Sequence, residues 1–279
     1  MRFNFFTFGG SIFWEDVFFY QKWRIQRNCC TKSYRLLDSW DICRASGSFE
    51  DCQKAFIKYI ECYEITKQHG DMVILLHGYL DSKNIFKPLW RKLMLTNANV
   101  AALNYPSLFR NAQGVAHQIL FFLNHIESIN RVSFVTKGCG NLVLQQMFNL
   151  PQELQTFRLN MRIGNIVEIN PVEQGSLLCE SLAKFKFFKF LLGPFLDDFT
   201  ESGIKNLPSL PSEFKVLKLF SKSKMQKIKD ILLKSFGFYS KTQQNISRHT
   251  IFIENNFKSV LKNEQVLNFT VKFINNGKL

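Results

Sequence analysis

The sequence predicts an α/β protein built on a mainly parallel central sheet with helices on both faces. After Gly70, short apolar runs alternate with amphipathic helical patterns, as they do in βαβ units. The first run, residues 72–76, is continuously apolar and stops at His77-Gly78, which is typical of a strand buried on both faces. Further strands are expected at 99–105, 131–135, 165–170 and 216–220.

The segments between these runs place apolar residues three or four positions apart, which predicts helices over 84–95, 112–129 and 140–150. Right-handed crossovers would bring the carboxyl ends of the strands to one edge of the sheet, where the reactive residues of such folds gather. The residues at the expected strand ends, which should therefore meet at this edge, are His77, Tyr105, Gly138 and Asn170.

Residues 1–68 precede this alternating pattern. They are predicted to form a helical or mixed extension that packs on one main domain of residues 69–279. Within the extension, apolar residues at helical spacing predict a helix over 48–65, and Ser48 is a suitable residue to cap it.

The aromatic-rich start of the chain could be a secretion signal or a structural segment. Glu15 and Asp16 interrupt the apolar stretch, and no small-residue cleavage site follows it. An uncleaved structural segment is therefore expected. Its aromatic spacing predicts an amphipathic helix over 12–23, which would pack on the domain or lie on a membrane.

The charge and the cysteine content restrict the partners and cofactors. The formal net charge is +14, but the basic residues are spread along the chain without a zinc finger or an RNP aromatic set, so no nucleic-acid partner is expected. The seven cysteines are odd in number and include no Cys-x-x-Cys pair. We therefore expect no metal site and no cofactor, and a reducing cytoplasm as the compartment.

Membrane association is a further possibility for this chain. No apolar run reaches the roughly 18 residues that span a bilayer. Residues 183–195 interleave Lys with Phe and Leu, a pattern that suits a helix with a buried apolar face or a membrane-facing surface. A cytoplasmic protein is expected, with peripheral membrane binding as the alternative.

The stretch "RVSFVTKGCGNLVLQQ", residues 131–146, has the shape of a nucleophile elbow. An apolar strand runs into a tight turn and an apolar helical pattern follows, as in the turn that presents a catalytic serine. Gly138 stands where the serine would be, and Cys139 stands beside it.

Several segments together resemble the α/β-hydrolase superfamily, in particular its bacterial lipase and esterase-like members. The resemblance runs from Met72 to the C-terminus. The segments that carry it are "VILLHGYLDS", "VAALNYPS", "VSFVTKGCGNLV", "IVEINPVEQGS" and "SRHTIFIENNFKSVLKNEQVLNFTVKFINNGKL". It implies an α/β-hydrolase fold, an ancestry in carboxylic-ester hydrolysis, and a short lid at residues 177–199.

The resemblance departs from the family pattern at the nucleophile. Gly138 takes the serine position, and glycine adopts the strained backbone of the elbow without the cost of about 1–3 kcal/mol that another residue bears. The first hypothesis is therefore a pseudoenzyme that has lost its nucleophile and binds an acyl group, a lipid or a protein partner.

An active esterase or thioesterase with Cys139 as nucleophile is the second hypothesis. A helix N-terminus and nearby Lys137 would lower the pKa of the thiol, although in the ungapped alignment the side chain of Cys139 packs against the sheet. The resemblance implies His249 as the base. Asp230 is the only carboxylate between Phe220 and His249, so it is the candidate acid.

The oxyanion hole and the surface complete the expectations. The resemblance implies that His77 and Gly78 start the oxyanion loop and that backbone N–H groups near Tyr79 and of Cys139 serve as donors. The third hypothesis is a peripheral membrane protein that works through residues 183–195, with the fold as a scaffold.

Overall fold

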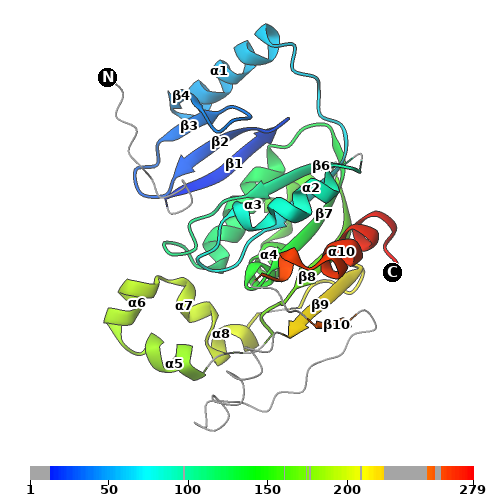
Figure 1. Cartoon of the computed structure of the whole chain (residues 1–279). Coiled ribbons are helices and arrows are strands. Elements are labelled where there is room, and N and C mark those ends of the chain that lie inside the picture. Colours follow the sequence, from blue (N-terminus) through cyan, green and yellow to red (C-terminus); the bar gives the residue numbers. More distant parts are fainter. Residues whose placement is uncertain are drawn as a thin grey trace.

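The computed structural model describes residues 13–96, 98–159, 161–173, 175, 177–207, 209–222, 250–254 and 259–279. Its centre is a six-stranded parallel sheet in the order β10-β9-β8-β7-β5-β6 (Figure 1). The strands are β5 (Gly70–Leu76), β6 (Asn99–Leu103), β7 (Ile129–Lys137), β8 (Arg162–Ile169), β9 (Val216–Lys222) and β10 (Thr250–Glu254). The predicted parallel sheet is confirmed.

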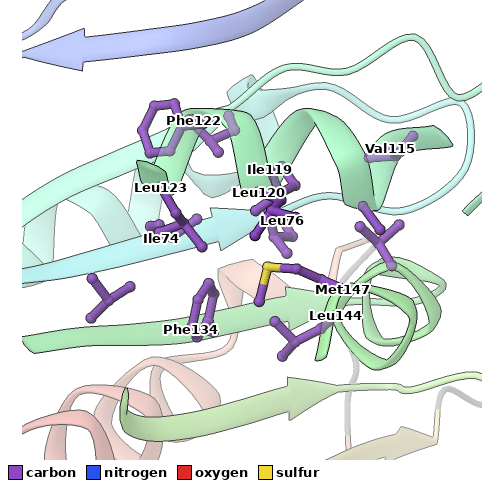
Figure 2. Close-up of a cluster of buried hydrophobic side chains, with 14 of the residues drawn as sticks. Ile74, Leu76, Val115, Ile119, Leu120, Phe122, Leu123, Phe134, Leu144 and Met147 are labelled. Carbon is purple, nitrogen blue, oxygen red and sulfur yellow. The ribbon is translucent and has the colours of Figure 1, made fainter. Parts of the chain in front are cut away.

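Helices cover both faces of this sheet. On one face lie α3 (Ala112–Asn124) and α4 (Gly140–Phe148), and on the other lie α2 (Lys87–Leu93) and α10 (Glu264–Asn276). Figure 2 shows the first face, where Ile119 and Leu123 of α3 and Met147 of α4 meet the side chains of β5 and β7. Apolar residues at helical spacing form these helices because burying that stripe against the sheet stabilises them.

The N-terminal segment forms a second sheet. Strands β1 (Trp14–Tyr20), β2 (Trp23–Asn28), β3 (Tyr34–Leu37) and β4 (Cys43–Gly47) pair antiparallel in that order. Helix α1 (Phe49–Cys62) follows, and Ser48 caps it in a capping box with Asp51, so the helix predicted there is confirmed.

The helix predicted over residues 12–23 is wrong, because the described part of that range is strand β1 and a tight turn. Gln21 and Lys22 connect β1 to β2 with φ angles of 46° and 71°, as a two-residue hairpin turn requires. Phe, Val, Tyr and Trp favour strands once a partner strand is available. Consecutive residues of β1 are buried, so the alternation that identifies a half-exposed strand does not appear in the sequence.

Buried acidic residues join the two sheets. The Asp16 backbone N–H donates to Asn104 O at 3.1 Å, and the Asn104 N–H donates to Asp16 Oδ2 at 2.7 Å. Gln118 of α3 donates to the Asp16 carbonyl at 2.8 Å. Beside them, fully buried Glu15 is paired with Arg27 and Arg110. The acidic pair that interrupts the apolar start of the chain therefore anchors β1 to the main sheet.

Four short helices follow β8 and lie together beyond the sheet (Figure 1). They are α5 (Leu177–Ala183), α6 (Lys186–Leu192), α7 (Phe195–Asp198) and α8 (Glu201–Lys205). Phe195 is fully buried in the core beneath α3 and α4, whereas Phe187 and Phe190 of α6 are 69% and 89% exposed. None of the described helices is both long and apolar enough to cross a membrane.

The remaining described helices are single 3₁₀ turns, which make short connections or helix ends. They are η2 (Lys83–Phe86), η3 (Gln152–Leu154), η4 (Thr156–Leu159) and η5 (Val260–Lys262). Of these, η2 runs directly into α2 and fixes where that helix starts after the loop that follows β5.

Candidate functional site

The turn between β7 and α4 has the backbone geometry of a nucleophile elbow. Gly138 has a φ of +54°, a conformation that residues with a Cβ rarely adopt, and its N–H donates to Ile169 O at 2.9 Å. Among the residues that the structure describes, a Cβ built on Gly138 would have one neighbour within 4 Å, Gly78 Cα at 3.8 Å. The predicted elbow residue and the predicted oxyanion loop therefore lie against each other, with room for a small side chain.

Gly140 explains how α4 comes so close to β5. A Cβ at this position would lie 2.7 Å from Leu76 O and 3.1 Å from His77 O, which is shorter than real contacts allow. Only glycine lets the first turn of the helix pass over the end of the strand. This contact holds the elbow beside the loop that follows β5.

His77 is a buried structural residue of that loop. Its Nδ1 lies 2.8 Å from Gly78 O, its Nε2 is 3.4 Å from the Tyr105 N–H, and its ring stacks on Tyr105 with centroids 3.9 Å apart. The Tyr105 hydroxyl donates in turn to His77 O. Burial lowers the pKa of His77 to about 4, so the ring is neutral at pH 7 and orients the loop through hydrogen bonds.

The side chain of Cys139 points into the core. It is 2% exposed and packs with residues of α3, α4 and β7. Burial raises the pKa of the thiol to about 12, and the hydrogen bond from the Tyr79 backbone N–H opposes this only in part. The thiol is therefore protonated at pH 7. The backbone N–H of Tyr79, one of the two expected oxyanion donors, points toward the sulfur of Cys139.

An ion pair closes the side of the elbow, which the sequence did not reveal. Lys137 Nζ lies 2.6 Å from Asp81 Oδ2, and both side chains are about a quarter exposed, at 25% and 28%. Asp81 follows Gly78 by three residues, and its N–H donates to Gly78 O at 3.2 Å. The carboxylate is thus held next to Gly78 and is compensated by the lysine.

Tyr79 connects the loop after β5 to the four short helices. Its hydroxyl donates to Leu192 O at the end of α6, and its ring packs on Phe195 and Phe199. Part of the segment expected as a lid therefore contacts the expected oxyanion loop.

Comparisons with known proteins give partial structural similarities. The sequence matches no family model and no curated protein. A metagenomic carboxyl esterase is similar to this protein with 14% sequence identity and a TM-score of 0.49. The similar region covers 61% of the present chain and 57% of the esterase chain, which is just over half of the esterase's length. A carboxylesterase of the thaumarchaeon Nitrososphaera gargenis is similar over 73% and 89% of the two chains, with 9% identity and a TM-score of 0.45. The similarity to a polyneuridine aldehyde esterase variant covers 76% of the present chain and 100% of the esterase chain, with 11% identity and a TM-score of 0.43.

The order of the parallel strands, together with an elbow that joins the central strand β7 to α4 beside the loop after β5, decides the fold. The chain has the α/β-hydrolase fold. The fold predicted from the resemblance is confirmed.

The two other proposed triad positions of this α/β-hydrolase-fold protein, His249 and Asp230, lie outside the described residues. Strand β10 begins at Thr250, the residue after His249, and runs parallel to β9, so the carboxyl end of β10 is Glu254. In a parallel sheet the reactive residues follow the carboxyl ends of the strands. Residues 255–258, which follow Glu254, include no histidine.

A buried polar row crosses the sheet next to the elbow. Thr136 pairs with Glu168, and Glu168 pairs with Lys218. Within the described part of the chain, Thr136 Oγ1 and Glu168 Oε1 are buried without a hydrogen-bond partner. Burial raises the pKa of Glu168 to about 7, an effect that Lys218 reduces and Glu173 reinforces.

Sequence reasoning missed this row, and one signal could have indicated it. Glu168 interrupts an otherwise apolar strand, and a charged residue at such a position is buried when both faces of the strand are covered. Lys218 donates to Glu173 Oε1 at 2.6 Å, so its ion pair is with the partly exposed carboxyl, and it acts on buried Glu168 only through its charge. The row can hold or release one proton near neutral pH.

Asn170, the fourth residue expected at the carboxyl edge, ties two strand ends together. Its side chain donates to Ser221 Oγ at 2.8 Å and accepts from the Ser221 N–H at 2.6 Å. Similarly, the Asn141 side chain makes two hydrogen bonds with the backbone of Val172. These bonds fix the edge of the sheet around Gly138.

Proposed function

We propose that this protein is related to carboxylic-ester hydrolases, has lost serine-based hydrolysis, and retains the elbow as a binding site for an acyl or carbonyl group. The observation that carries the proposal is Gly138. It keeps the left-handed backbone of an elbow, with a φ of +54°, and supplies no hydroxyl. An elbow without a nucleophile leaves only binding and residual electrostatic effects, which in serine hydrolases amount to about 10³–10⁴-fold over water.

The surroundings of Cys139 support loss of the nucleophile rather than its transfer to the thiol. A nucleophilic cysteine needs an accessible thiolate, and helix ends or cations usually provide it. Cys139 is 2% exposed and its pKa is raised to about 12 by burial. Attack by this sulfur would require both deprotonation and a rotation out of the core.

The surroundings of the elbow support retention of a small polar pocket. Among the described residues, a Cβ on Gly138 would make only an ordinary contact with Gly78 Cα, at 3.8 Å, and Asp81 and Lys137 beside the elbow neutralise one another. A carbonyl group could enter this space and accept a hydrogen bond from the N–H of Cys139. Binding of a carbonyl group through this backbone N–H would not require the missing serine.

The test is hydrolysis of a short-chain p-nitrophenyl ester by the wild type, Gly138→Ser and Gly138→Ala. Gly138→Ala is the matched control, because it carries the same backbone strain without the hydroxyl. We expect the wild type and Gly138→Ala to be equally inactive. Turnover by the wild type that iodoacetamide or Cys139→Ala abolishes would replace the proposal with the thiol-esterase alternative.

Gly138→Ser reports on the rest of the site. A gain of turnover that His249→Ala removes would identify His249 as the surviving base. No gain means either that more of the site than the nucleophile has been lost or that this ester does not fit it. Binding is measured separately, by titration calorimetry of the wild type with a medium-chain fatty acid, and Gly138→Leu, which fills the space beside Gly78, should abolish it.

Helix α6 favours membrane attachment as a second function. Phe187 and Phe190 are 69% and 89% exposed; Lys184 and Lys186 precede them in the sequence, and Lys189 lies between them. Exposed aromatic residues between lysines suit the interface of an anionic bilayer. Cosedimentation with phosphatidylserine vesicles should weaken with salt and should be lost in Phe187→Ser/Phe190→Ser. Equal cosedimentation of this variant and the wild type would rule α6 out.

A further inference from the structure

A cavity lies outside the elbow and shares no residue with it. Its volume is about 440 Å³, and it lies between the N-terminal sheet and the outer strand β6 of the parallel sheet. Its walls come from the β1–β2 turn, the loop after β3, η2 with α2, and Val100 and Ala102 of β6. The cavity therefore exists only because the N-terminal sheet stands beside the α/β-hydrolase fold.

The charges around this cavity are strongly unbalanced. Five cationic side chains line it and only one carboxylate does, which leaves four positive charges uncompensated; these residues are Lys22, Arg24, Lys83, Lys87, Arg91 and Asp41. Asp41 Oδ1 and Oδ2 lie 3.1 Å from Arg24 Nη2 and 3.2 Å from Lys83 Nζ. Among the residues described, no carboxylate lies within 4.0 Å of the cationic nitrogens of the other three.

The arrangement costs stability in the absence of an anion. Lys87 and Arg91 are four residues apart on α2, so they project on one side of the helix, and like charges at this spacing repel. The Arg24 side chain is only 12% exposed, and its Nε is buried without an acceptor in the described structure. A buried donor without an acceptor is unfavourable, and an anion in the cavity would relieve both costs.

An aromatic ring contacts one of these cations. Lys22 Nζ lies 5.7 Å from the centre of the Trp90 ring, at the distance of a cation–π contact. Lys22 itself is fixed by the hairpin turn, where its φ is 71°. The positive charges of the turn and of α2 therefore line the same cavity.

We propose that this basic cavity binds a ligand with at least two phosphate groups. Arginine and lysine are the side chains that bind phosphate, through paired hydrogen bonds and as point charges respectively. Each phosphate monoester carries about −1.5 to −2 charges at pH 7, so two of them match the four surplus positive charges. The ligand is a free polyphosphorylated small molecule or the headgroup of a polyphosphorylated lipid.

The experiment uses two probes that separate these sources. Titration calorimetry with inositol hexakisphosphate measures the soluble ligand, and cosedimentation with phosphatidylcholine vesicles containing phosphatidylinositol bisphosphate measures the lipid headgroup. Binding of either probe supports the site and identifies its source. Absence of binding to both probes overturns the proposal.

Charge reversal on α2 locates the binding. Lys87→Glu/Arg91→Glu changes two exposed helical side chains of the cavity, and Lys54→Glu/Lys58→Glu is a matched control on α1, with the same spacing, exposure and change of net charge. We expect the α2 variant to bind roughly 10- to 100-fold more weakly and the α1 variant to stay within about twofold of the wild type.

Equal weakening in the two variants would mean that the probes respond to the overall charge of +14, and the proposal would fail. Matching thermal unfolding curves establish that both variants are folded. The outcome does not depend on ester hydrolysis, because none of the substituted residues belongs to the elbow.

Discussion

Lys137 Nζ and Asp81 Oδ2 are 2.6 Å apart, so an ion pair joins the end of β7 to the loop that follows β5. The elbow and the expected oxyanion loop are held together by this pair as well as by the contact between Gly78 and Gly138. The pair therefore has a structural role that can be measured independently of any activity.

The first prediction concerns this ion pair. A double-mutant cycle with Lys137→Met and Asp81→Asn should give a coupling free energy of about 1 kcal/mol in urea unfolding, near the upper end for pairs that water reaches. High salt should reduce the coupling because it screens partly exposed charges. Additive effects of the two substitutions would mean that the pair does not connect the two segments.

The second prediction compares two glycines of the elbow. Gly138→Ala should lower the free energy of unfolding by about 1–2 kcal/mol, the cost of the left-handed backbone, because a Cβ there has space. Gly140→Ala should cost about 2–3 kcal/mol, because its Cβ would meet Leu76 O at 2.7 Å and the helix must shift. Chemical denaturation measures both, and the reverse order would contradict this geometry of the elbow.

The third prediction concerns cysteine reactivity. Iodoacetamide should modify Cys30, Cys43 and Cys62 in the native protein, because these side chains are exposed. Cys139 should stay unmodified until the protein is unfolded in urea, since its thiol is buried and protonated. Peptide mass mapping with and without urea gives the result, and early modification of Cys139 would favour a nucleophilic role.

The fourth prediction concerns pH and Glu168. Burial raises the folded-state pKa of Glu168 from 4.5 to about 7, so between these values the folded state binds more protons than the unfolded state. Glu168 therefore favours folding most at low pH, and its contribution falls by up to about 3 kcal/mol as pH rises from 4.5 to 7. Glu168→Gln should remove this slope, so the variant should gain stability relative to the wild type as pH rises.

His77 makes the comparison with a variant necessary. Its folded-state pKa is lowered from 6.5 to about 4, so the unfolded state binds more protons in that range and this contribution rises with pH. The two opposite contributions overlap in the wild type. Unfolding free energies of the wild type and Glu168→Gln at several pH values separate them, and a pH-independent difference would mean that Glu168 titrates normally.

The sequence by itself determined most of the α/β-hydrolase fold. A continuous apolar run before His77-Gly78 and a short β-forming run before Lys137-Gly138 predict strands. The helical spacing of apolar residues over 112–123 predicts a helix. The position of Gly138 at the elbow follows from the same local pattern. Local periodicity suffices here because each element buries its own apolar residues against the common sheet.

The rest was decided only in the tertiary structure, because it depends on partners distant in the sequence. Residues 14–28 are strands and not a helix because β1 pairs with β2 and Asp16 bonds Asn104. The raised pKa values of Glu168 and Cys139 depend on burial beneath other elements. The basic cavity combines residues from the N-terminal hairpin with residues of α2, and no short segment contains that combination.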